Sequence, residues 1–156
     1  MTWRGSTTVP DRIFACLPYL LPLIDGLAFG GYLFRQFPAL QLLFLPLDPL
    51  MQIYNLPFAS LIIFFALYLA VVRNESICHF IRFNAMQAIL LDIVLMLCGL
   101  VLKIFTGFQV AFIAETLYNM VFLGVLAAFV YAVVQSALGR YAEIPPLSDA
   151  VYMQVP

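Results

Sequence analysis

The segment LYNMVFLGVLAAFVYAVVQSAL, at residues 117–138, decides the fold class of this chain. It carries no charged side chain over its whole length. A helix needs about 20 mostly apolar residues to cross the ~30 Å hydrocarbon core of a bilayer. The segment is long enough and apolar enough to do this, so it predicts a transmembrane helix.

The composition of the whole chain agrees with this prediction. Of its 156 residues, 65% are hydrophobic and 10% are charged, whereas a soluble domain has roughly 45–50% apolar and about 25% charged residues. A soluble protein of ~150 residues still exposes about 30% of the surface of its unfolded chain. The apolar excess must therefore face lipid, and the length suits one compact membrane domain.

Three further segments are predicted to cross the membrane. The segment at 57–72 is uncharged but slightly short, and its helix is expected to begin at Pro57 because proline suits a first helical turn. The segments at 13–34 and 85–105 are longer, and each retains an aspartate. The expected fold is therefore all-α: a polytopic membrane protein with a bundle of four transmembrane helices over residues 13–138.

Residues 35–56, between the first two spans, are predicted to form an interfacial or shallow re-entrant helical segment. Their three prolines forbid one long straight helix. The polar residues nevertheless follow helical spacings of 7, 4 and 3, at Gln41, Asp48, Gln52 and Asn55. A pair of short helices at the membrane surface fits this pattern better than a fifth span, and an apolar loop buried against the bundle is the alternative.

Both ends of the chain are predicted to lie on the cytoplasmic or stromal side. Residues 1–12 form a polar flank that lacks the composition of a transit peptide, and the first span is expected to be a retained helix. Residues 139–156 form a polar tail that is expected to be extended on the surface. Arginine and lysine concentrate in inner loops, and five of the seven fall on the side of the termini: Arg4, Arg12, Arg73, Arg82 and Arg140. Arg35 and Lys103 fall on the other side.

Asp25 lies about twelve residues into the first predicted span, where an unpaired carboxylate costs a few kcal/mol. Gly26 and Gly30 follow it as a GxxxG pair, which lets a neighbouring helix approach closely. One interpretation makes Asp25 a polar point that lines a cavity or a path. The alternative is a helix that breaks at Asp25, which would then lie in the membrane interface.

Asp92 lies near the middle of the predicted span at 85–105 and is expected well inside the membrane. Lys103 follows eleven residues later on nearly the same helix face, but ~16 Å away by helical rise, which is too far for a salt bridge. Asp92 therefore needs a proton, a water or a partner from another helix. A transport role and a structural hydrogen bond between helices both account for it.

Polar side chains also gather where the second span leads into the third. Four of them are candidates for contact with a path or a partner: His79, Arg82, Asn84 and Gln87. His79 and Arg82 are about one helical turn apart and share a side of the helix. They are suited to bind a lipid phosphate, a partner subunit or an emerging peptide, and a solvated, positively charged linker is the alternative.

The last span carries a ridge of small residues at every fourth position: Gly124, Ala128, Ala132 and Ser136. Small residues permit close contact between membrane helices. The ridge predicts helix packing, either within the bundle or against another subunit.

Several functional classes are excluded by what the sequence lacks. It has no nucleophile–base pair, phosphate-binding loop or HExxH motif, so no catalytic residue, cofactor or enzymatic activity is expected. A single histidine without a second ligand at helical spacing makes no metal site. A net charge of -1 without a clustered basic face excludes nucleic-acid binding.

Four strings of the sequence resemble one known family. They are LPYLLPLIDG at 17–26, FFALYLAVVRN at 64–74, FIRFNAMQAILLD at 80–92 and EIPPLSDAV at 143–151. Together these resemble the Tic-twenty family, the small four-helix subunit of the translocon at the inner envelope membrane of chloroplasts, with its cyanobacterial and plastid-encoded relatives. The resemblance covers nearly the whole chain.

The resemblance implies a function that the residues alone do not indicate. It implies four helices with both termini on the stromal side, in the plastid inner envelope or a cyanobacterial membrane. It also implies a role in protein import, with other translocon subunits, precursor polypeptides and lipid as partners and a homo-oligomer as one possible assembly. The family has no agreed catalytic residues. A small-solute or amino-acid transporter using Asp25 and Asp92, and a purely structural membrane scaffold, are the alternatives.

Overall fold

The computed structural model describes residues 7–108, 111–145 and 147–156. Within these ranges every regular element is a helix, so the predicted all-α class is confirmed. Three stretches are long and apolar enough to cross a membrane, and a bent helix pair makes four if it counts as one span: Val9–Gln36, His79–Gly107, Ala111–Ala137, and Leu40–Tyr54 with Ala59–Val72. Arg4 and Pro146, which belong to patterns discussed above, lie outside the described ranges.

The first span is a run of short helices rather than one regular helix. Thr8 begins it with a reciprocal cap: its Oγ1 accepts from the Asp11 amide at 3.3 Å, and Oδ2 of Asp11 accepts from the Thr8 amide at 3.0 Å. Pro18 and Pro22 lack an amide donor. At Pro18 the chain winds into a short 3₁₀ helix. The elements are α1 (Val9–Cys16), η1 (Leu17–Tyr19), α2 (Leu20–Leu27), η2 (Ala28–Gly30) and α3 (Gly31–Gln36).

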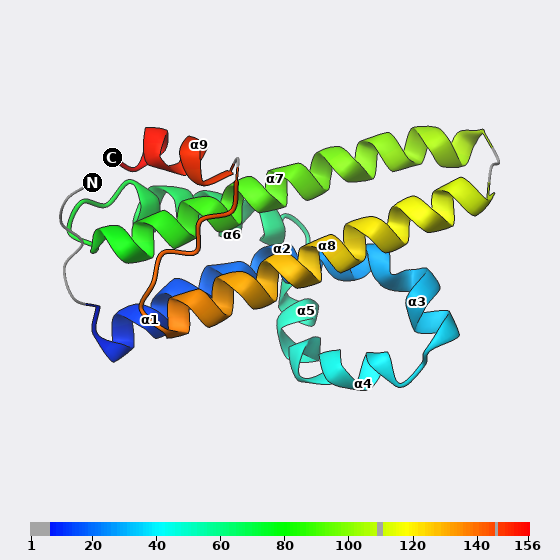
Figure 1. Cartoon of the computed structure of the whole chain (residues 1–156), viewed down its shortest axis with the longest axis horizontal. Coiled ribbons are helices and arrows are strands. Elements are labelled where there is room, and N and C mark those ends of the chain that lie inside the picture. Colours follow the sequence, from blue (N-terminus) through cyan, green and yellow to red (C-terminus); the bar gives the residue numbers. More distant parts are fainter. Residues whose placement is uncertain (1–6, 109–110, 146) are drawn as a thin grey trace.

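The two longest helices, α7 (His79–Gly107) and α8 (Ala111–Ala137), run antiparallel beside this first span (Figure 1). Helix α2 contacts both of them. Their shared core buries apolar side chains from all three: Leu27, Phe29, Leu91, Leu95, Leu102, Phe122 and Val125. The outer faces of α7 and α8 keep large apolar side chains exposed, as contact with lipid requires: Leu97, Leu100, Ile104, Met120, Leu123 and Val130.

Glycines allow α2 and α8 to approach each other closely. A Cβ atom at Gly26 would lie 2.5 Å from Cγ1 of Val125, and one at Gly30 would lie 2.8 Å from Cε1 of Phe122. Neither distance is compatible with a side chain, so the contact requires glycine at both positions. The GxxxG pair therefore lies at a helix–helix interface within this chain.

Between the first span and α7 the chain leaves the bundle and returns to it (Figure 1). The outward part comprises α4 (Leu40–Phe44), η3 (Leu45–Leu47) and α5 (Asp48–Tyr54), and the returning part comprises α6 (Ala59–Leu67) and η4 (Tyr68–Val72). Phe58 makes the turn between them with a φ of 62°, a conformation that a bulky residue rarely adopts. The two parts are bent by 97°, which confirms the helical segment predicted between the first two spans.

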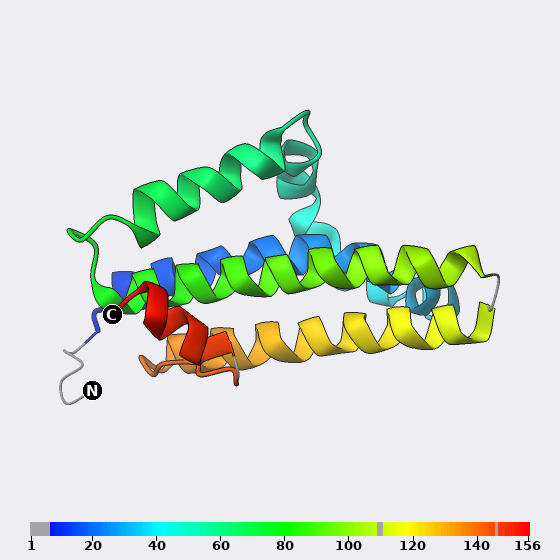
Figure 2. The same cartoon turned by 90° about the horizontal axis from the view of Figure 1, so that it is seen from above.

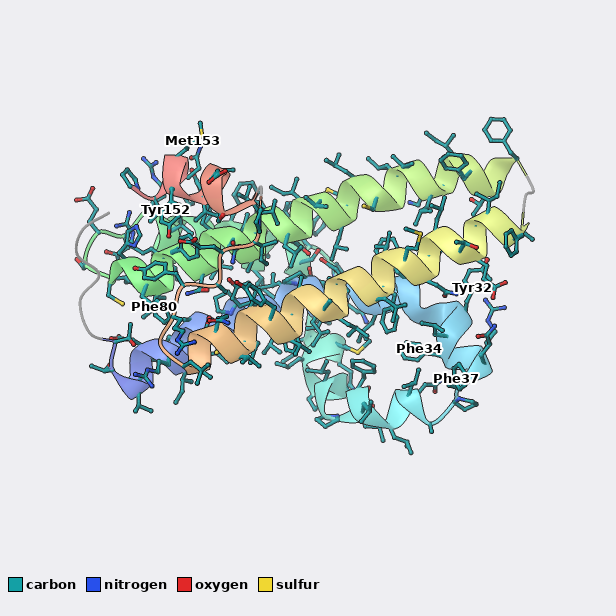
Figure 3. All side chains as sticks on the ribbon, viewed as in Figure 1. Tyr32, Phe34, Phe37, Phe80, Tyr152 and Met153 are labelled. Atoms are coloured by element: carbon teal, nitrogen blue, oxygen red, sulfur yellow. The ribbon has the colours of Figure 1, made fainter. Side chains whose placement is uncertain are left out.

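Aromatic rings attach the outward part to the bundle. Phe34 of α3 lies 5.7 Å from Phe44 of α4 and 5.4 Å from Phe122 of α8, between ring centroids and with edge-to-face geometry. In Figure 3, Phe34 lies closer to α8 than Phe37 does. Helix α6 is joined to the bundle through its continuation η4, which contacts α7. Helix α6 itself diverges from the long helices (Figure 2).

The C-terminal tail is folded, so the expectation of an extended surface tail is wrong. Residues 147–154 form helix α9 (Leu147–Gln154), which packs on α7 (Figure 1). Val151 and Val155 are fully buried with Val72 and Phe83. Val155 directly follows α9 and donates to the Val151 carbonyl at 2.8 Å, so the two valines lie on the same side of the tail. Met153 points away from the bundle (Figure 3), so α9 is amphipathic and covers an apolar part of α7.

Candidate functional site

The structure brings together two predicted residues, Asp25 of α2 and Asp92 of α7. Their carboxyl groups are close enough to interact electrostatically and line the same cavity. Tyr54, the last residue of α5, donates a 2.8 Å hydrogen bond to Oδ2 of Asp25. Asp92 is 6% exposed, and its Oδ1 has no hydrogen-bond partner among the residues that the structure describes. We call Asp25, Tyr54 and Asp92 the acidic site.

Helix α2 does not break at this site. It continues through Asp25 and Gly26 to Leu27, and the chain tightens only afterwards, at Ala28–Gly30. The alternative of a helix break at Asp25 is therefore wrong. The continuous helix holds the Asp25 carboxyl opposite α7 within a stretch that is apolar enough to span a membrane.

The acidic site lines a cavity of about 490 Å³, a size typical of small-molecule sites. Its polar lining consists of the two carboxyl groups and the hydroxyls of Tyr54 and Ser60. The rest of the lining is apolar: Phe29, Leu61, Phe64, Ile93, Leu95, Met96 and Gly99. A second cavity of about 530 Å³ shares Asp25 and Tyr54 with the first and is bounded by α4 and α5.

Electrostatics set what the acidic site can do. Within the described part of the chain, no lysine, arginine or histidine forms an ion pair with either carboxyl group. Two adjacent carboxylates in apolar surroundings repel each other and lose hydration. The site can therefore hold a proton or a cation between the two groups. No described group of three or more histidine, cysteine, aspartate or glutamate residues is arranged to hold a metal ion.

Two other predicted residues, Asn84 and Gln87 of α7, are fully buried, which rules out the solvated alternative for them. Asn84 Oδ1 accepts hydrogen bonds from Tyr19 Oη at 2.7 Å and from Ser136 Oγ at 3.2 Å. Its Nδ2 donates to the Phe80 carbonyl at 2.8 Å. Asn84 thereby links the first span, α7 and α8 in the bundle interior.

Gln87 connects this interior to the tail. Its Nε2 donates to Tyr19 Oη at 2.8 Å and to the Ala142 carbonyl at 2.5 Å, and its Oε1 accepts from the Ile144 amide at 3.3 Å. A buried amide group that satisfies two backbone groups of another segment fixes the path of that segment. Gln87 therefore holds the chain that leads from α8 to α9.

His79 holds the far end of the tail. Its Nε2 lies 2.9 Å from the Val155 carbonyl and its Nδ1 lies 2.8 Å from Tyr141 Oη. A carbonyl only accepts, so Nε2 donates to Val155. The ring also stacks on Tyr152 at 6.3 Å with an interplanar angle of 9°. His79 and Gln87 therefore both hold the tail, whereas Asn84 joins the helices of the bundle.

Arg82 has a separate role although it lies one turn after His79. Its Nε donates a 2.9 Å hydrogen bond to the Val72 carbonyl at the end of η4. A guanidinium at the C-terminal end of a helix satisfies a carbonyl that has no partner in the helix. Arg82 thereby fixes the end of the second span next to α7.

The small-residue ridge of α8 divides between two environments. Ala132 and Ser136 are fully buried, and Ala128 is half-buried. Gly124 is exposed, and a Cβ atom there would meet no described atom within 4 Å. The ridge thus turns from the bundle interior at one end to the outer surface at the other.

Three tyrosines that complete these sites did not stand out in the sequence: Tyr19, Tyr54 and Tyr141. The chain has eight tyrosines, and their side chains suit both apolar packing and hydrogen bonding. The one usable signal for Tyr54 was its place near the end of the polar helical pattern of residues 41–55, three members of which line a cavity together with Asp25 and Tyr54.

Comparison with known proteins identifies the family. The family described as "Chloroplast import apparatus Tic20-like" matches residues 7–151. The chain belongs to the Tic20 family. This confirms the resemblance of the four strings to the Tic-twenty family, and it makes the chain a multi-pass membrane protein of a translocon family and not an enzyme.

Relatives of the chain come from a cyanobacterium and from plants. A Tic20 family protein of Synechocystis is 57% identical, over 99% of each chain. "Protein TIC 20-II, chloroplastic" of Arabidopsis thaliana is 39% identical over 99% of this chain and 78% of the relative. "Protein TIC 20, chloroplastic" of Pisum sativum is 31% identical over 93% of this chain and 58% of the relative.

Proposed function

We propose that this chain is a membrane subunit of a protein-import translocon. It contributes to the path or the scaffold for precursor proteins that cross the plastid inner envelope or the corresponding cyanobacterial membrane. The observation that carries the proposal is the family match over residues 7–151, which includes all the candidate spans and the folded tail up to Val151. Relatives named as chloroplast TIC 20 proteins support it.

The proposal includes partners and a topology. Other translocon membrane subunits, precursor polypeptides and lipid are the partners, and a second copy of the chain fits the exposed end of the α8 ridge at Gly124. Both termini face the stroma or cytoplasm. The excess of arginine on that side supports this orientation, and so does the position of α1 and α9 at the same end of the bundle (Figure 1).

Site-specific photo-crosslinking to an arrested precursor tests the proposal. We place the photoreactive residue at Ser60 or Met96, which line the cavity of the acidic site, and at Leu123, which is exposed on the outer face of α8. A precursor that passes the cavity crosslinks to the first two positions and not to Leu123. Equal labelling at all three positions contradicts a path, and no labelling in a purified, precursor-engaged complex contradicts the subunit role.

The cavity favours a second candidate, a small-solute or amino-acid transporter. It combines two intramembrane carboxyl groups with a volume of about 490 Å³, and such groups commonly mark solute or proton pathways. Protein reconstituted in liposomes would then show saturable amino-acid uptake that Asp92→Asn abolishes. Uptake no faster than in empty liposomes removes this candidate.

A further inference from the structure

We infer that the acidic site binds an organic cation, an alkylguanidinium or alkylammonium group whose charge lies between Asp25 and Asp92. The inference follows from the side chains around the cavity. It stands whether or not the chain carries precursor proteins, because it concerns binding and not translocation.

One buried oxygen of the acidic site has no donor among the described residues. Asp92 is buried to all but 6% of its surface and lines the cavity, and none of the described residues donates a hydrogen bond to its Oδ1. Buried polar atoms are almost always hydrogen-bonded. Tyr54 supplies a donor to Asp25, whereas Asp92 shares the cavity with the Asp25 carboxyl, which is an acceptor when ionised. The missing group is a donor, and a positive charge also offsets the repulsion between the two carboxyl groups.

The size and chemistry of the cavity suit an organic cation better than a metal ion. Ca²⁺ and Mg²⁺ take six or more oxygen ligands in a compact shell, but the described lining offers two carboxyl groups and two hydroxyls in about 490 Å³. The remaining wall is apolar and includes the rings of Phe29 and Phe64. Aromatic rings attract organic cations, and an apolar wall accommodates an alkyl chain. The cavity therefore fits a charged head with an apolar body better than an inorganic ion.

The cavity is accessible beside α6. The wall formed by α6 contributes Ser60 and Leu61, which are both exposed, and α6 diverges from the long helices there (Figure 2). A ligand can enter beside α6 without unfolding the bundle. Two sources share the required chemistry: a free organic cation, and the arginine or lysine side chain of an apolar peptide.

The test is equilibrium binding of n-hexylguanidinium to the purified full chain in phosphatidylcholine nanodiscs, measured by dialysis against empty nanodiscs. We expect saturable binding with a Kd on the order of 1 mM or lower. The neutral analogue n-hexylurea should bind at least about tenfold more weakly, because it has no charge for the carboxyl pair. Equal binding of the two probes overturns the inference and leaves an apolar cavity only.

Two variants localise the binding, and a third serves as the matched control. Asp92→Asn should weaken n-hexylguanidinium binding at least about tenfold, whereas Glu75→Gln, the same kind of change at an exposed residue of the linker after η4, should leave it unchanged. Gly99→Leu keeps both carboxyl groups but fills the cavity next to Phe29, whose Cζ would lie 3.6 Å from an added Cβ atom. It should also weaken binding, and it decides the question if Asp92→Asn does not purify as a folded protein. Unchanged binding in the folded variants overturns the inference.

A peptide arm of the same experiment identifies the source of the cation. The probe is an uncharged leucine-rich pentapeptide with one central arginine, and its control has citrulline in place of arginine. Binding of the arginine peptide that Asp92→Asn weakens assigns the site to polypeptide side chains. Binding of n-hexylguanidinium alone assigns it to free organic cations. Both results support the cation site, and failure of both probes contradicts it.

Discussion

Tyr54 Oη donates a 2.8 Å hydrogen bond to Asp25 Oδ2, and this bond joins the bent segment to the first span. Tyr54 ends α5 and Asp25 lies in α2. Both residues line both cavities of the site, so the hydrogen bond stands where the two cavities adjoin. The bond therefore ties the end of α5 to α2 at the boundary that the two cavities share.

Tyr54→Phe removes this bond and keeps the ring. A hydrogen bond to a charged or buried carboxyl group contributes about 1.5–3 kcal/mol, so we expect a loss of roughly that size in the free energy of unfolding, measured by titration with sodium dodecyl sulfate in mixed micelles. Hydrogen exchange should rise in α4 and α5 and stay unchanged in α8. Tyr131→Phe, at an exposed position of α8, is the control. Equal stability of the two variants contradicts the role of the bond.

Gly26→Ala tests the close contact between α2 and α8. The added methyl group would lie 2.5 Å from Cγ1 of Val125, and valine is too stiff to move aside at low cost. Overpacking of this kind destabilises by about 1–3 kcal/mol. Gly31→Ala is the matched control, since a Cβ atom there meets no described atom within 4 Å, and alanine favours helix over glycine. We expect a lower thermal midpoint for the first variant and an unchanged or higher one for the second.

The same contact allows a rescue experiment. Combining Gly26→Ala with Val125→Ala removes the two valine methyl groups that the new side chain would meet. The double variant should be more stable than the sum of the single changes predicts, because the two residues interact directly. Strict additivity of the two effects would show that the contact is not the cause of the loss.

Gln87→Leu tests whether α7 holds the tail. Leucine has a similar size but leaves the Ala142 carbonyl and the Ile144 amide without the partners that Gln87 gives them. Each unsatisfied buried group costs about 1–3 kcal/mol, so trypsin should cleave after Arg140 much faster than in the parent protein. Gln52→Leu, at an exposed position of α5, should leave the cleavage rate unchanged. An unchanged rate in Gln87→Leu would mean that apolar packing of α9 alone holds the tail.

The fold was predictable where the length and composition of one segment are enough to determine its structure. The uncharged run at 117–138 is long enough to cross a bilayer, and it lies largely within α8. The helical spacing of Gln41 and Asp48, interrupted by prolines, indicated a bent helical segment, and one is present. The tail was mispredicted because its prolines and polar residues outweighed the pair Val151 and Val155, whose spacing of four already indicated an amphipathic helix.

The sites were less predictable because they depend on which helices pack together. Asp25 and Asp92 each stood out as a charge at membrane depth, but only the contact of α2 with α7 brings them into one cavity. Asn84 and Gln87 looked like members of a polar linker because they follow His79 and Arg82 closely in sequence. They are buried because α7 begins at His79, which places both residues on helix turns that face the first span and the tail.

His79→Phe separates hydrogen bonding from packing at the end of the tail. Phenylalanine can keep the stack on Tyr152 but loses the hydrogen bonds to Tyr141 and to the Val155 carbonyl, at a cost of about 1 kcal/mol for each bond. The Val155 amide, which donates to the Val151 carbonyl at 2.8 Å, should exchange faster by about tenfold. The Ile144 amide, which Gln87 holds, should keep its exchange rate.

Gln87→Leu should give the opposite pattern, with faster exchange at Ile144 and a smaller effect at Val155, so each variant serves as the control for the other. This follows because the two residues contact different stretches of the tail, on either side of α9. If each variant speeds up hydrogen exchange at both amides, the tail detaches as one cooperative unit. In that case the hydrogen bonds of His79 and Gln87 act jointly to hold α9 over Phe83, and neither end of the tail opens by itself.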